Sequence, residues 1–131
     1  MLEGQYVNDW IKNFHGKALI YGKMRVGPLP AAGALAGVIR KYPDKIFIEN
    51  GTVWIVEGKI KPSTAAVGQL KFYADQFPVT PEFYFAKDLP VKKILLTTRE
   101  DPDVRTFAEK EGLTYEVYLP EWLQKILEAR V

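Results

Sequence analysis

The dipeptide Asn50-Gly51 separates two segments, 45–49 and 52–56, that are rich in β-branched and aromatic residues. Both segments have the composition that is favoured in β-strands. Asn-Gly is a strong short-range signal for a β-hairpin, because both residues of a type I′ turn need positive φ angles. The sequence therefore predicts a tight antiparallel hairpin over residues 45–59.

This turn fixes which residues of the two strands face each other. With Asn50 and Gly51 as the loop, Asp44 is opposite Glu57, and Lys59 projects from the same face. Directly opposed residues have Cβ atoms about 4.5–5.5 Å apart. Two carboxylates at that distance repel each other, and a cation between them relieves the repulsion. The pattern therefore indicates a divalent-metal site with an adjacent lysine.

Length and composition indicate a single domain over residues 1–131 that is large enough to bury a core. No apolar run is as long as a membrane span, and the N-terminus lacks a signal-peptide hydrophobic region. The absence of cysteine excludes disulfides, thiolate metal ligands and iron–sulfur clusters. We therefore expect an intracellular, cytoplasmic protein with no membrane partner.

The net charge of +2 is too small to indicate a nucleic-acid partner by itself. Its distribution is more informative, because residues 11–61 contain nine Lys or Arg residues and three acidic residues. A basic region around the carboxylate pair would attract a polyanion. The alternative is a lysine-rich surface that is merely solvated, and charge alone favours this alternative.

The rest of the chain alternates between helix and strand patterns. Leu2, Tyr6, Trp10 and Phe14 recur every four residues and predict a helix over 3–14. Further helices are expected from 62–64 to about 77 and over 102–111 and 120–129, further strands over 17–26, 91–98 and 113–118, and a breaker-rich loop over 27–37. This order predicts an α/β protein with a mixed central sheet flanked by helices.

The sequence contains Pro43-Asp44 and, after a gap of twelve residues, Glu57-Gly58-Lys59. This pattern resembles the PD-(D/E)XK nuclease superfamily, which has the restriction-endonuclease-like fold. The downstream Gln69 and Tyr73, four residues apart, are similar to a motif of the RecB-like and Cas4-like branch, and small archaeal or viral nucleases are also similar. The resemblance covers about residues 1–98. It implies an α-β-β-β-α-β core, to which this chain adds a C-terminal α-β-α extension.

The resemblance implies a metal site for Mg²⁺ or Mn²⁺. Asp44 and Glu57 would be its carboxylate ligands, the carbonyl of Gly58 a third ligand, and Glu3 on the first helix an acid that completes the site. The alternative for Glu3 is a favourable interaction with the helix dipole in the first turn. For the pair, the alternative is that Asp44 only opens a strand and that Glu57 forms a surface ion pair with Lys59.

The resemblance also implies roles beyond metal binding. Lys59 would orient or help to deprotonate the attacking water, and Gln69 would touch a ligand, a water or DNA. Tyr73 shares a helix face with Gln69 and would contact nucleic acid, with core packing as the alternative. Further expected nucleic-acid contacts are Lys61, Arg40 and Lys41.

The sequence thus predicts a divalent-metal-dependent DNA nuclease that hydrolyses phosphodiester bonds, with a homodimer as a further expectation. The first alternative is a catalytically inactive nucleic-acid-binding or assembly protein that keeps the fold. The second is an unrelated α/β protein in which Asp44 and Glu57 do not converge. ATP is not expected as a partner, because residues 27–37 lack the Gly-Lys-Ser/Thr ending of a phosphate-binding loop. The cysteines that the Cas4-like branch often carries are also missing.

Overall fold

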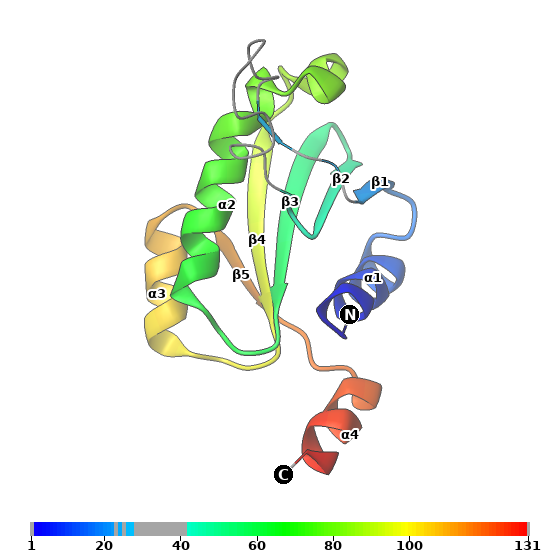
Figure 1. Cartoon of the computed structure of the whole chain (residues 1–131), viewed down its shortest axis with the longest axis vertical. Coiled ribbons are helices and arrows are strands. Elements are labelled where there is room, and N and C mark those ends of the chain that lie inside the picture. Colours follow the sequence, from blue (N-terminus) through cyan, green and yellow to red (C-terminus); the bar gives the residue numbers. More distant parts are fainter. Residues whose placement is uncertain (1, 23, 25, 28–41, 131) are drawn as a thin grey trace, which may run out of the picture.

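The structure is a computed structural model, and it describes residues 2–22, 24, 26–27 and 42–130 (Figure 1). The predicted loop at 27–37 therefore lies outside the described residues except for Gly27. The elements are α1 (Leu2–Phe14), β1 (Leu19–Gly22), β2 (Lys45–Glu49), β3 (Thr52–Lys59), α2 (Thr64–Gln76), the 3₁₀ turns η1 (Phe77–Val79) and η2 (Pro81–Ala86), β4 (Val91–Thr97), α3 (Pro102–Lys110), β5 (Thr114–Val117) and α4 (Glu121–Ala129).

The strands form one sheet in the order β1-β2-β3-β4-β5. The β1–β2 and β2–β3 pairs are antiparallel, whereas β3–β4 and β4–β5 are parallel. The parallel pairs need crossover connections, which α2 and α3 supply. The predicted mixed α/β sheet is therefore confirmed.

The turn between β2 and β3 adopts the predicted geometry. Asn50 and Gly51 have φ angles of 52° and 73°, as a hairpin turn with two positive φ angles requires. Glu49 pairs with Thr52, and Lys45 pairs with Val56 at the other end of the ladder. The predicted register is therefore confirmed, and its next step places Asp44 beside Glu57.

Helices cover both faces of the sheet, and each face has its own buried cluster (Figure 1). On the face of α2 and α3, β3 contributes Val53 and Ile55, which pack with Leu70 of α2. On the face of α1 and α4, Val56 packs with residues of both helices. Because side chains alternate along a strand, Glu57 faces the same layer as Ile55.

The C-terminal β5–α4 segment is tied to α1 by polar contacts. Trp122 Nε1 donates to Asp9 Oδ2 over 3.1 Å, and Tyr118 Oη donates to the same oxygen over 2.5 Å. Trp10 Nε1 donates to Glu116 Oε2 over 2.6 Å. The extension therefore forms part of the layer that holds α1 against the sheet.

Two segments differ from the sequence expectation. The strand expected over 17–26 is shorter in the described residues, because the ladder that β1 forms with β2 ends at Gly22. The chain after α2 continues as η1 and η2 instead of a plain loop. Phe77 of η1 and Phe83 of η2 are both buried in the core. Within the described part of the chain, no helix combines the length and apolar character that a membrane span requires.

Candidate active site

The hairpin brings Asp44 and Glu57 together through reciprocal backbone contacts. The backbone N–H of Asp44 donates to Glu57 Oε1 over 2.9 Å. The backbone N–H of Gly58 donates to Asp44 Oδ2 over 2.7 Å. Each carboxylate is thus oriented by the main chain next to the other, so the convergence that the sequence predicted is present in the structure.

Both carboxyl groups lie in an environment that disfavours two negative charges. Glu57 is only 5% exposed, and burial, followed by the charge of Asp44, raises its pKa to about 8. Burial is also the main cause that raises the pKa of Asp44. The positive charge of Lys59 lowers both pKa values but is outweighed by burial. The pair therefore needs a proton or a cation to be stable.

Glu3 belongs to the same electrostatic cluster. Its Oε2 accepts a hydrogen bond from the backbone N–H of Ile60 over 3.1 Å. Its charge also raises the pKa values of Asp44 and Glu57. Among the described residues, however, no three His, Cys, Asp or Glu side chains lie close enough to hold one metal ion together.

The donor set nevertheless fits a hard divalent cation. Mg²⁺ prefers oxygen ligands, usually takes one or two carboxylates from the protein, and keeps several waters. Asp44 and Glu57 supply two adjacent carboxylates, one of which is almost fully buried. Their mutual repulsion is what a bound cation would relieve. The carbonyl of Gly58 as a further ligand stays a prediction.

Gly58 is also required for packing. A Cβ at this position would lie 2.4 Å from Val7 Cγ2 on α1 and 3.5 Å from Tyr6 Cδ2. Val7 is fully buried, so it has little room to move away. The glycine between Glu57 and Lys59 therefore lets α1, which carries Glu3, approach the strand that carries the site.

We expect Gly58→Ala to destabilise the protein by about 1–3 kcal/mol, because the added methyl group overpacks a dense core. Urea unfolding measures this change. Gly68→Ala on α2 is the matched control, because a Cβ there meets nothing within 4 Å and the free energy of unfolding should not fall. Combining Gly58→Ala with Val7→Ala should cost less than the sum of the two single changes. Wild-type stability of Gly58→Ala would contradict this account of the packing.

Lys59 lies beside the pair at the end of β3 and is partly buried. Its neighbour across the parallel ladder is Thr97, whose side chain is fully buried. Within the described structure, Thr97 Oγ1 has no hydrogen-bond partner. Sequence reasoning missed this hydroxyl, because only the register of β3 and β4 brings it next to Lys59.

Tyr73 and Gln69 of α2 have different environments. Tyr73 is 5% exposed, packs in the core, and donates from its hydroxyl to the carbonyl of Tyr42 over 2.9 Å. Burial, and then the charges of Glu57 and Asp44, raise the pKa of Tyr73 to about 12. This matches the core-packing alternative, and a contact with nucleic acid stays a prediction.

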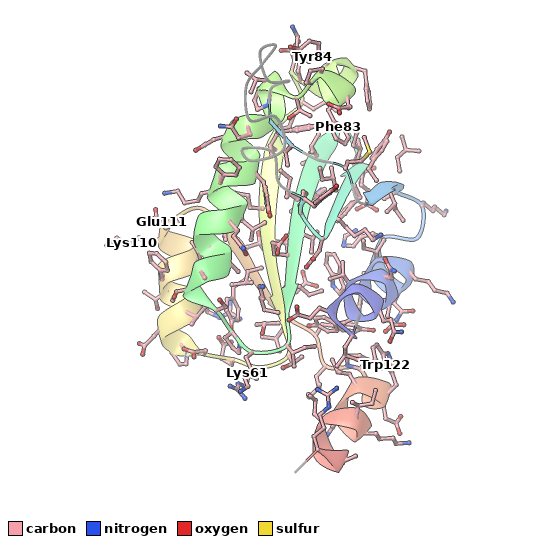
Figure 2. All side chains as sticks on the ribbon, in the orientation of Figure 1. Lys61, Phe83, Tyr84, Lys110, Glu111 and Trp122 are labelled. Atoms are coloured by element: carbon pink, nitrogen blue, oxygen red, sulfur yellow. The ribbon has the colours of Figure 1, made fainter. Side chains whose placement is uncertain are left out.

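Gln69 is exposed, and with Tyr73 it lines a separate depression on α2. Its contact with substrate also stays a prediction. Lys61 is exposed in the loop after β3, where Figure 2 shows it projecting from the molecule. Arg40 and Lys41 lie outside the described residues. The structure thus brings Asp44, Glu57, Lys59 and Glu3 into one cluster. The expected contacts of the other site residues with nucleic acid stay predictions.

The architecture is that of a nuclease fold, as comparison with solved structures shows. The crystal structure of a repair endonuclease from Pyrococcus abyssi matches with a TM-score of 0.53 and 18% identity, over 87% of this chain and 46% of that chain. The structure of EndoMS in complex with double-stranded DNA matches with a TM-score of 0.54 and 19% identity, over 92% of this chain and 46% of that chain.

These likenesses confirm the predicted nuclease fold. At such low identity they show the fold and not the activity, and this chain spans less than half the length of either chain. No family model matches the chain, and no curated protein matches it.

Proposed function

We propose that the protein is a divalent-metal-dependent DNA nuclease that hydrolyses phosphodiester bonds. The observation that carries the proposal is the meeting of Asp44 and Glu57 beside Lys59 at one end of β3. The fold is shared with endonuclease structures, and one of those structures is a complex with double-stranded DNA, which supports DNA as the partner.

The residues of the site have separable tasks in this proposal. Asp44 and Glu57 would hold Mg²⁺ or Mn²⁺, which would polarise a phosphate oxygen and lower the pKa of a bound water. Backbone N–H groups fix the orientation of both carboxylates before any ligand arrives. Lys59 would hold the attacking water and offset the negative charge that builds on the phosphate. Glu3, through its bond to Ile60, would keep α1 next to the site.

Cleavage assays with and without metal test this function. We expect labelled single-stranded, duplex or four-way-junction DNA to be cut in Mg²⁺ or Mn²⁺ and to stay intact in EDTA, because the paired carboxylates need the cation. Metal-dependent binding of DNA without cleavage of any form would support the inactive nucleic-acid-binding alternative instead. If the protein neither binds nor cleaves any of these DNAs, the proposal is refuted. The predicted homodimer and cytoplasmic location stay predictions.

A further inference from the structure

A cleft of about 480 Å³ opens beside the carboxylate pair. One wall is the N-terminal half of α1, with Glu3, Gly4 and Asn8, and the other wall is the segment 42–45. Because Glu3 and Asp44 both line it, the cleft leads to the candidate metal site. Its volume lies in the range of about 300–1,000 Å³ that is typical of sites for small ligands. The cleft can therefore accommodate one nucleotide of a longer substrate.

The wall formed by α1 leaves space and unused hydrogen-bonding groups. A Cβ at Gly4 would meet nothing within 4 Å, so the helix backbone is open to a ligand. Asn8 lies one turn further along the same face and is exposed, and its side chain has no hydrogen bond with the residues that the structure describes. Its side-chain amide offers both donors and an acceptor, as recognition of a base edge requires.

The opposite wall presents an aromatic ring on a fixed backbone. The side chain of Tyr42 is 51% exposed at the cleft. Its carbonyl accepts a hydrogen bond from the buried Tyr73 hydroxyl over 2.9 Å, which anchors the backbone. Only Pro43 separates Tyr42 from Asp44 in the chain, so a base stacked on this ring would lie next to the carboxylate pair.

We infer that this cleft binds an unpaired nucleotide next to the phosphate that is cut, with its base stacked on Tyr42. Stacking needs a free base face, and bases inside a duplex are already stacked on their neighbours. The preferred substrate is therefore single-stranded DNA, or duplex DNA with an unpaired or extruded nucleotide at the cleavage position. This inference rests on the proposed function and names its substrate class.

The test compares binding of three labelled DNAs by fluorescence anisotropy, in Mg²⁺ and on a Lys59→Ala background in which cutting is slowed about 10²–10⁴-fold. The DNAs are a single strand, a duplex with one unpaired nucleotide, and the same duplex fully paired. Tyr42→Ala should weaken binding of the first two about tenfold and leave the third unchanged, because stacking on one base contributes that much. Tyr42→Trp should retain binding, since it keeps an aromatic face.

A pair of substitutions on the other wall gives a second test. Gly4→Leu should fill the cleft and weaken binding of the single strand at least tenfold, whereas Gly4→Ala should have little effect. Both changes replace glycine inside a helix, so neither should lower the melting temperature. Equal binding by wild type, Gly4→Leu and Tyr42→Ala would overturn the inference.

The outcomes also separate the inference from the proposed function. Suppose that Tyr42→Ala leaves single-strand affinity unchanged, while the protein without the Lys59→Ala change still cuts DNA in Mg²⁺. The inference is then wrong and the nuclease proposal stands. A fully paired duplex bound as tightly as the single strand would overturn the substrate class in the same way. If no DNA is bound or cut, both fail.

Discussion

Lys59→Ala will slow DNA cleavage by about 10²–10⁴-fold, which is the range that a positioned proton-transfer group contributes. The Lys59 charge acts on both carboxyls, since it lowers the pKa values of Asp44 and Glu57. Among the described residues, Lys45 lowers the pKa of Asp44 alone, whereas Lys59 acts on both carboxyl groups. Removing the Lys59 amine therefore removes the group that we propose holds the attacking water beside the two carboxylates.

Single-turnover cleavage at saturating protein measures this loss, because it isolates the chemical step from DNA binding. The assay is best made well above pH 8, because Glu57, whose pKa is raised to about 8, is then mostly ionised in the wild type. Loss of the Lys59 charge, which raises the pKa of Glu57 further, then has less effect on its protonation. Lys125→Ala is the control, since Lys125 is an exposed lysine on α4 that pairs with Glu121. A Lys59→Ala rate within twofold of wild type would exclude a catalytic role for Lys59.

The metal-free protein will lose stability as the pH rises from about 4.5 to about 8. The pKa of Glu57 is raised from 4.5 in the unfolded chain to about 8 in the native protein. Between these values the native state binds more protons than the unfolded state, so stability is fully present below pH 4.5 and falls up to pH 8. The loss is on the order of a few kcal/mol.

Glu57→Gln isolates this contribution, because the amide cannot ionise. Chemical unfolding of the metal-free variant should show a much weaker dependence on pH over the same interval. Asp44, whose pKa is also raised by burial, accounts for the slope that remains. Glu128→Gln is the matched control at an exposed position on α4 and should keep the wild-type slope. A wild-type slope in Glu57→Gln would show that Glu57 is already ionised in the native protein.

The hairpin and its consequences could be predicted from local sequence. Asn50-Gly51 strongly favours a tight turn, and a two-residue turn fixes every pair along the ladder. Because side chains alternate, that register also fixed the faces of Asp44, Glu57 and Lys59. The carboxylate cluster was therefore predictable without knowledge of the rest of the fold.

Features that depend on long-range packing were not predictable. The contact of Trp122 with Asp9 joins residues that no periodicity relates. Tyr73 shares a helix face with Gln69, yet only the packing of α2 on the sheet buries one and exposes the other. Gly58 matches the nuclease pattern as a ligand position, but the close approach of Val7 became visible only in the structure.

The sequence did not predict the cleft between α1 and the segment 42–45, for a related reason. Asn8 reads as one polar position of an amphipathic helix, and Tyr42 as an aromatic residue before a strand. Neither signals a ligand until α1 and the segment 42–45 face each other across the cleft. A sequence pattern places residues on one element, whereas this cleft lies between two.

The central claim is that Asp44 and Glu57 share a divalent cation, and thermal unfolding at pH 8 with increasing Mn²⁺ tests it most directly. The melting temperature of the wild type should rise steadily with Mn²⁺, because a ligand that binds only the native state stabilises it. Asp44→Asn should show no rise. A flat wild-type titration, or an equal rise in Asp44→Asn, would contradict a metal site at these two carboxylates.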